Sequence, residues 1–230
     1  MTPTLQILLL LGIALALLGL LGVVLYWQFI VAEGAYLGRR VVVLLYDRFA
    51  FRYDEVKDFN PLSDAILLAG PIVAHAPAGR VLDIASGTGR LPCALFAQTG
   101  FSGRVSALDA SAGMLAVAKH KLSAYSDRID WHHRSAAPLP FAAEQFDAVA
   151  CLEALEFLPD ADASLREMWR VLRPGGLLLV SNRIGPDAWK LPGRAPPTPV
   201  FLERLLACGF IDAEAQDWLI DYDLVRAQKP

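Results

Sequence analysis

Two glycines and an acid, spaced so that one short loop can grip a nucleotide-like ligand, are the first feature of this sequence that could do chemistry. Apolar Val81 and Leu82 lead to Asp83, and Gly87 and Gly89 follow in R-V-L-D-I-A-S-G-T-G-R-L-P, residues 80–92. Glycine permits positive φ and close approach of a ligand, and the start of a helix directs backbone N–H groups at the same spot. The stretch predicts a strand, a tight turn and a helix that bind such a ligand.

A second acid narrows the kind of ligand. Asp109 ends the apolar run 105–108, where a carboxylate at the end of a neighbouring strand can accept both hydroxyls of a ribose. A dinucleotide site would need a third glycine, and Leu91 and Pro92 stand in its place. The spacing therefore disfavours a nicotinamide-dependent oxidoreductase, which remains the least favoured alternative.

With two later segments added, the sequence resembles the class I S-adenosylmethionine-dependent methyltransferases, in particular the small-molecule group (methyltransferase type 11) that includes the quinone-biosynthesis enzymes. The resemblance covers about residues 46–229 and depends on V-L-D-I-A-S-G-T-G (81–89), V-S-A-L-D-A-S (105–111), F-D-A-V-A-C-L-E-A-L-E-F-L (146–158) and L-R-P-G-G-L-L-L-V (172–180). It implies methyl transfer from S-adenosyl-L-methionine to a small-molecule or lipid-like acceptor. A catalytically silent scaffold that binds the same cofactor is the alternative from another class.

The resemblance also implies contacts with the cofactor. Gly87 and Gly89 would surround its methionine part, and Asp83 would hold the amino group. Asp109 would bind the ribose, and Ala110 and Met114 would flank the adenine. The further contacts that it implies are Tyr53 as an aromatic lid, Ala85, Ser86, Ser135, Ala136 and Cys151. Ala85 replaces a frequent glycine, and Ser135 stands where the family usually has an acid. A hydroxyl binds more weakly than a carboxylate, so we expect lower cofactor affinity.

Glu153 and Glu156 are the candidates for a general base. Transfer of an activated methyl group depends mainly on alignment, and a base is needed only where the acceptor must lose a proton. A spacing of three would put both carboxylates on one helical face. Solvation, or capping of the helix at this turn, is the favoured alternative. The four histidines and three cysteines show no ligand constellation, so we predict no metal site.

The periodicity predicts an α/β protein with a largely parallel, doubly wound sheet. The resemblance implies a Rossmann-like sheet of seven strands with an antiparallel last strand. Strands are expected near 81–83, 105–109, 128–133, 146–151, 176–181, 210–216 and 218–227, and helices at 62–75, 91–98, from Ser111 onwards, 165–172 and 200–207. The ligand should lie at the carboxyl ends of the parallel strands.

Residues 5–31 contain no charged residue, which predicts one transmembrane helix. A cleaved signal peptide is the alternative, but no basic residue precedes the run and no convincing cleavage site follows it. Arg39, Arg40 and Arg48 follow the run, so the positive-inside rule places the catalytic domain on the cytoplasmic side. The expected division is 1–32 as anchor, 33–60 as juxtamembrane linker and lid segment, and 61–230 as methyltransferase domain.

Two connecting segments, 41–45 and 182–199, complete the expected arrangement. Residues 41–45 either continue a helix along the lipid surface or pack on the domain. Residues 182–199, rich in proline and glycine, are expected to select the acceptor, because long loops commonly act as lids or binding elements. A net charge of only −3 gives no basic field for a nucleic-acid partner.

Overall fold

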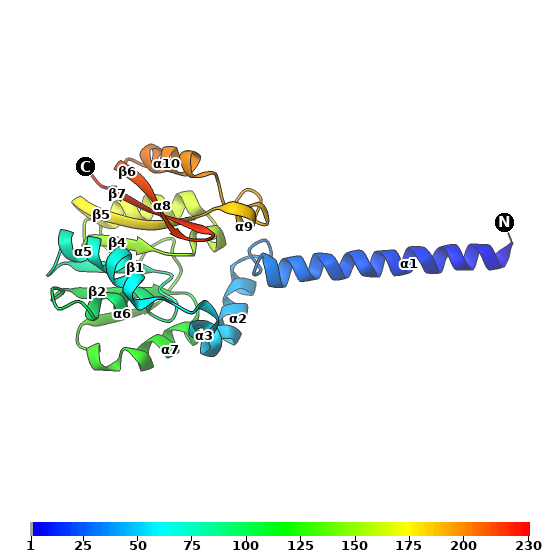
Figure 1. The fold of residues 1–230 in the computed structure, drawn as a ribbon, viewed down its shortest axis with the longest axis horizontal. Coiled ribbons are helices and arrows are strands. Elements are labelled where there is room, and N and C mark those ends of the chain that lie inside the picture. Colours follow the sequence, from blue (N-terminus) through cyan, green and yellow to red (C-terminus); the bar gives the residue numbers. More distant parts are fainter. Residues whose placement is uncertain (1) are drawn as a thin grey trace.

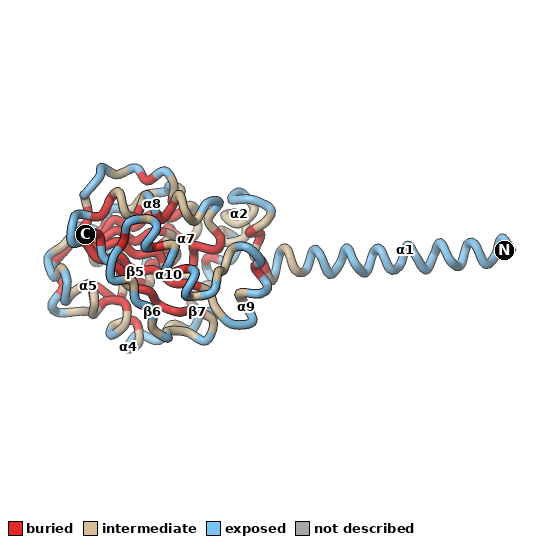
Figure 2. The backbone as a smooth tube through the Cα atoms, turned by 90° about the horizontal axis from the view of Figure 1, so that it is seen from above, coloured by how far each residue is buried: buried red, intermediate tan, exposed pale blue. Residues whose placement is uncertain are grey.

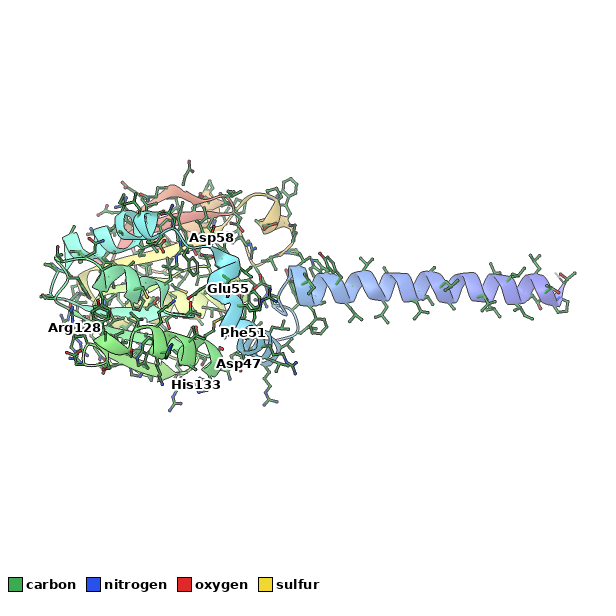
Figure 3. All side chains as sticks on the ribbon, turned by 60° about the horizontal axis from the view of Figure 1, so that its bottom comes forward. Asp47, Phe51, Glu55, Asp58, Arg128 and His133 are labelled. Atoms are coloured by element: carbon green, nitrogen blue, oxygen red, sulfur yellow. The ribbon has the colours of Figure 1, made fainter. Side chains whose placement is uncertain are left out.

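The structure, a computed structural model, describes residues 2–230 and consists of an α/β domain from which one long helix extends (Figure 1). This helix, α1 (Pro3–Tyr26), continues into a π-helical segment, η1 (Trp27–Val31). None of its residues is buried, and along α1 the side chains project away from the domain on all sides of the helix (Figure 3). With a mean hydropathy of 3.0 over its most apolar window, Pro3–Val31 is long and apolar enough to cross a membrane. The predicted helix over 5–31 is confirmed.

Seven strands form one sheet in the order β3-β2-β1-β4-β5-β7-β6. Strand β7 runs antiparallel to both of its neighbours, and the pairings among β1 to β5 are parallel. The strands are β1 (Arg80–Ile84), β2 (Arg104–Asp109), β3 (Ile129–His133), β4 (Phe146–Cys151), β5 (Leu172–Arg183), β6 (Ile211–Leu219) and β7 (Tyr222–Gln228). The predicted doubly wound, mostly parallel sheet is confirmed, although β5 is longer than the expected 176–181.

Helices cover both faces of this sheet and also form a separate group at the edge where α1 joins the domain. Their bounds are α2 (Arg39–Phe49), η2 (Ala50–Arg52), α3 (Tyr53–Lys57), α4 (Pro61–Asp64), η3 (Ala65–Ala69), α5 (Gly70–His75), α6 (Arg90–Phe96), α7 (Ala112–Lys121), η4 (Ser123–Tyr125), η5 (Leu155–Phe157), α8 (Ala161–Val171), α9 (Gly185–Trp189) and α10 (Thr198–Ala207). The helix expected over 62–75 is thus three consecutive segments, with the π-helical η3 just before Pro71. Proline lacks an N–H group and clashes with the preceding turn, so a local change of helix type is expected there.

Two apolar clusters hold the helices to the sheet. Side chains of α8 and α10, such as Leu165 and Leu205, pack on one face, and side chains of η3, α5 and α6, such as Ile72 and Leu95, pack on the other. The parallel strands between them are buried on both sides, as the dense buried region in Figure 2 shows. This explains why strands such as β4 read as continuous apolar runs rather than as alternating patterns.

The segment 182–199 packs against the end of the long helix. The Trp27 Nε1–H donates to the carbonyl of Lys190 at 3.0 Å, and the Tyr36 hydroxyl donates to the carbonyl of Pro192 at 2.8 Å. Leu191 is buried in a small cluster with Ala32 and other residues of this junction. These contacts join the end of the long helix to the domain at residues far away in the sequence.

Candidate active site

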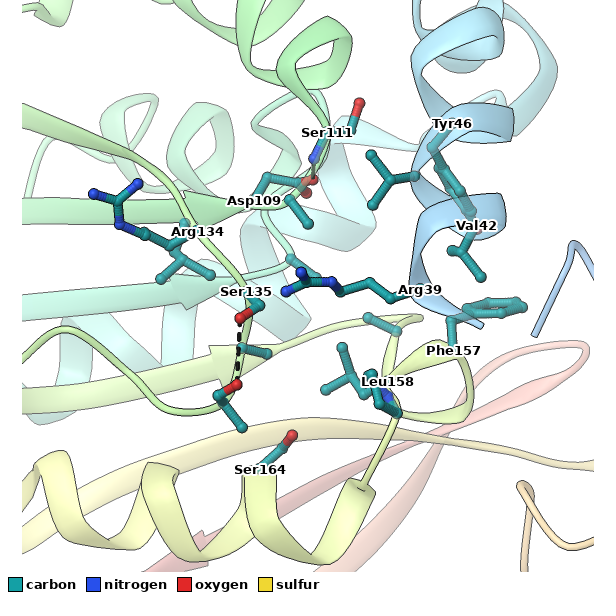
Figure 4. Close-up of a pocket in the computed structure, with 18 of the residues that line it drawn as sticks. Arg39, Val42, Tyr46, Asp109, Ser111, Arg134, Ser135, Phe157, Leu158 and Ser164 are labelled. Atoms are coloured by element: carbon teal, nitrogen blue, oxygen red, sulfur yellow. Dashed lines mark hydrogen bonds between the residues drawn. The ribbon is translucent and has the colours of Figure 1, made fainter. Parts of the chain in front are cut away.

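A cavity of about 640 Å³ lies at the carboxyl ends of β1, β2 and β4, in the size range of small-molecule sites (Figure 4). Two groups of residues face each other across it. The sheet wall comes from the strand ends and the loops that follow them, and the roof comes from α2. The sheet wall includes Ala85, Gly87, Asp109, Ser135 and Glu153, and the roof consists of Arg39, Val42, Val43 and Tyr46.

Asp109 and Gly87 lie side by side in the sheet wall. The Asp109 carboxylate, at the end of β2, accepts hydrogen bonds from the Gly87 N–H at 2.8 Å and the Ser111 N–H at 2.7 Å. Each carboxylate oxygen keeps a lone-pair direction, enough to accept the two hydroxyls of a ribose. Gly87 has a φ of +53°, and a Cβ built on it would meet no atom within 4 Å. Its main chain is therefore open to a ligand.

Asp83 lines a second, smaller cavity of about 40 Å³ together with Ser86 and Arg90. This cavity is an extension of the first, because the two share five lining residues, namely Tyr53, Ala85, Gly87, Leu152 and Glu153. The Asp83 carboxylate is almost fully buried and accepts no hydrogen bond within residues 2–230. Burial, and the neighbouring Asp109 carboxylate, raise the pKa of Asp83 well above its usual range. The buried Ser86 hydroxyl also lacks a partner within the described chain. These buried polar groups need a polar ligand to complete them.

This arrangement fits S-adenosylmethionine. Asp83 offers a carboxylate to an ammonium group, Asp109 offers acceptors to a ribose, and Gly87 leaves the path between them free of a side chain. The cofactor, when bound, supplies a methyl group activated by its positive sulfur. The contribution of the chain is to bind and align, which is where catalysis of such a transfer mainly comes from.

Most of the predicted contacts line this cavity or its extension. They are Tyr53, Asp83, Ala85, Ser86, Gly87, Asp109, Ala110, Met114, Ser135 and Ala136. Tyr53 stacks among aromatic neighbours, with its ring 6.1 Å from that of Tyr46 and 6.0 Å from that of Phe59. The Ser135 hydroxyl, which stands where an acid was expected, donates to the carbonyl of Ala137 at 3.2 Å (Figure 4).

Gly89 and Cys151 were also expected to contact the cofactor, but they line neither the cavity nor its extension. A Cβ on Gly89 would lie 2.8 Å from Leu122 Cδ1 and 3.4 Å from Ala118 Cβ, and its N–H donates to the carbonyl of Ser86. Gly89 thus lets α6 start close to α7. Cys151 is fully buried in β4, where desolvation raises the pKa of its thiol, and it lines neither the cavity nor the extension.

The two glutamates do not share a helical face, because Glu153 precedes η5 in a turn with a φ of +50°. Glu153 lines the cavity and pairs with Lys57 and Arg90, each at 2.6 Å. Glu156 lies behind the cavity lining, almost fully buried, and accepts a hydrogen bond from the Tyr222 hydroxyl. Burial raises the pKa of Glu156 despite this bond. The pair expected to act together is therefore split between the site and the core.

The roof is the part of the site that the sequence did not reveal. Arg39, Val42, Val43 and Tyr46 lie at spacings of three and four on α2, a pattern that could have indicated a helix facing a pocket. Asp47, at the junction of α2 with the domain, accepts a hydrogen bond from the Gly113 N–H at 2.8 Å (Figure 3). Residues 41–45 therefore pack on the domain, whereas residues 182–199, expected to select the acceptor, do not line the cavity.

Comparison with known proteins agrees with this geometry. Residues 82–180 match the family model Methyltransf_11, described as a methyltransferase domain. The chain is 32% identical over 141 residues to the ubiquinone/menaquinone biosynthesis C-methyltransferase UbiE of Geotalea daltonii, covering 59% of this chain and 60% of that protein. It is 37% identical over 144 residues to UbiE of Hahella chejuensis, covering 60% and 58%. The match thus spans about three fifths of the length of these relatives.

A solved structure confirms the fold. Phosphoethanolamine N-methyltransferase 2 of Haemonchus contortus, in complex with S-adenosyl-L-methionine, superposes with a TM-score of 0.66 at 18% identity, over 80% of this chain and 57% of that one. The family match runs from β1 into β5 and includes the acids at the ends of β1 and β2. Over residues 82–180 the chain therefore matches a methyltransferase domain, on a fold shared with a methyltransferase that binds S-adenosyl-L-methionine.

Proposed function

We propose that this protein is a membrane-anchored methyltransferase that transfers a methyl group from S-adenosylmethionine to a quinone-like or other lipid-like small molecule. The observation that carries the proposal is the continuity of the site. The polar extension at Asp83 leads into a larger, mainly apolar cavity, and the roof of that cavity is the helix that follows the long apolar helix. An apolar acceptor bound there would lie beside the polar end of the cofactor site.

The proposed anchor is α1 with η1, which remains part of the protein. Its end is bonded to the domain through Trp27 and packed through Ala32, so the apolar helix is continuous with folded structure. The positive-inside rule and the arginines after residue 38 support a cytoplasmic catalytic domain. We expect N-terminal sequencing of the membrane-bound protein to retain residues of α1. Proteolysis of inside-out vesicles, but not of right-side-out vesicles, should remove the domain.

Activity is tested with the full chain in lipid nanodiscs, given S-adenosylmethionine that carries a tritiated methyl group. Quinols that lack a ring methyl group are the first acceptors, and a total membrane-lipid extract and a soluble-metabolite extract are the other two. We expect label in the quinol and in the lipid extract. Label in the soluble extract alone would overturn the lipid-like acceptor but keep the methyltransferase.

The alternative is a scaffold that binds the cofactor without using it. The observation in its favour is that both candidate bases are already paired, Glu153 with two cations and Glu156 with Tyr222. Binding of S-adenosylhomocysteine with no label in any of the three acceptor pools would support the scaffold. Absence of binding would contradict both functions.

A further inference from the structure

The carboxylates that line the cavity all have partners within the described chain. Asp109 accepts from two backbone N–H groups, Glu153 pairs with Lys57 and Arg90, Asp160 accepts from the Ala163 N–H, and Glu167 pairs with Arg170. The cavity therefore holds no free carboxylate that could serve as a counter-ion for a further cation.

Arg39 is a cation that lines the cavity and has no counter-ion there. It is the first residue of α2, and its side chain crosses the cavity towards Ser135 (Figure 4). Within residues 2–230 its guanidinium forms no ion pair and no hydrogen bond, although four carboxylates line the same cavity. Arg166, on α8, also lines the cavity without a bonded partner. The acceptor side thus carries unpaired positive charge, which favours an anionic ligand.

The surroundings of Arg39 limit the shape of that ligand. Val42 and Val43 come from the same helix, and Phe157 and Leu158 come from the segment after β4, where the Phe157 ring lies 6.1 Å from that of Tyr46. These side chains favour an apolar body, while the guanidinium favours an oxyanion through two parallel hydrogen bonds. The amino-acid end of the cofactor would lie in the extension at Asp83, so it does not supply this anion.

We propose that Arg39 binds the acceptor by an ionised oxygen, a phenolate, enolate or carboxylate, carried on an apolar ring that packs against the apolar side chains of the roof and of residues 157–158. This names the acceptor class and so rests on the proposed function. It also places a binding residue on the helix that follows the apolar span. The position of Arg39 would then couple the acceptor site to the membrane-proximal segment.

The test measures binding rather than turnover, with the full chain in nanodiscs, empty nanodiscs as blank, and isothermal titration calorimetry. The anionic probe is 2-naphthoate and the neutral probe is 2-naphthamide, each with S-adenosylhomocysteine present. The variants are Arg39→Gln, Arg39→Lys, Arg166→Gln and Arg40→Gln. Arg40 is the matched control, because it neighbours Arg39 on the same exposed helix end but does not line the cavity.

We expect Arg39→Gln to weaken 2-naphthoate at least tenfold and to leave 2-naphthamide unchanged. Arg39→Lys should lie between the two, since an ammonium keeps the charge but loses the forked geometry. The proposal is overturned if Arg40→Gln or Arg166→Gln weakens naphthoate as much as Arg39→Gln does, or if Arg39→Gln has no effect. S-adenosylhomocysteine should bind all variants within about twofold of wild type. If the wild type did not bind S-adenosylhomocysteine, that result would instead contradict the proposed function.

Discussion

The two sides of the cavity are built by different means. In the sheet wall, Asp83 is fixed between β2 and β4 by its pairing with Ala107 and Ala150, and Asp109 is held by two backbone N–H groups. The roof, in contrast, is a helix with no buried residue, fastened to the domain by a few side-chain contacts such as those of Asp47.

This difference separates recognition of the cofactor from recognition of the acceptor. Main-chain groups and buried carboxylates in a parallel sheet hold one geometry, because the ladder and the core around them would have to break before they could move. A surface helix can change its exposed side chains at little cost in stability. In the proposed function, the sheet wall therefore suits binding of the cofactor and the roof suits binding of the acceptor.

The sharpest test of the sheet wall is Asp109→Ala. The change removes the acceptor of two backbone N–H groups and, in the proposed complex, of the ribose hydroxyls. Hydrogen bonds to a charged group contribute about 1.5–3 kcal/mol each, so we expect S-adenosylhomocysteine to bind at least about 100-fold more weakly by calorimetry. Asp130→Ala, on the exposed surface of β3, is the control and should bind normally. Unchanged binding in Asp109→Ala would remove the basis for the cofactor site.

The two glycines of the loop test which residue serves the ligand. Gly87→Ala and Gly89→Ala both place a side chain at positive φ, which costs about 1–2 kcal/mol of stability. Gly89→Ala must also displace Leu122, so its cost should be about 1 kcal/mol larger in thermal or urea unfolding. Only Gly87→Ala should weaken S-adenosylhomocysteine, by about tenfold. Equal losses of affinity would show that Gly89 also faces the ligand.

Asp83→Asn tests the free buried acid. Its raised pKa means that the folded state binds more protons than the unfolded state from about pH 4 upward, so stability falls as pH rises through the raised pKa. We expect Asp83→Asn to raise Tm at neutral pH and to flatten its decline with pH. The same change should weaken S-adenosylhomocysteine by about tenfold, because the ammonium loses its counter-charge. A lower Tm with unchanged affinity would give Asp83 a structural role alone.

The smallest effect is expected at the junction with the long helix. Tyr36→Phe removes the hydrogen bond to the carbonyl of Pro192, a partly exposed contact worth about 0.5–1 kcal/mol. Hydrogen exchange should become faster in residues 185–194, while binding of S-adenosylhomocysteine stays within about twofold of wild type. A large loss of cofactor binding would show that this junction and the sheet wall are coupled more tightly than their contacts indicate.

Most of the sheet wall could be predicted because its residues follow regular elements. The carboxyl ends of neighbouring parallel strands lie at the same edge of the sheet. Carboxylates at the ends of two such strands must therefore lie close together, as Asp83 and Asp109 do. Spacing alone does not say which way a residue in a turn faces. The side of Gly89 that would carry a Cβ faces Leu122 at the end of α7. Glu153 has a positive φ, so it is not on the helix that its spacing to Glu156 had implied.

What the sequence determined by itself was the order of strands and helices, the apolar helix at the beginning and the chemistry of the strand ends. Local periodicity and backbone preferences are enough for these, because each depends on residues close together in the chain. Only the tertiary structure brought Arg39 opposite Asp109 and joined Trp27 to Lys190. Contacts between residues that are distant in the sequence depend on how whole elements pack. No local pattern specifies which distant surface a short amphipathic helix will cover.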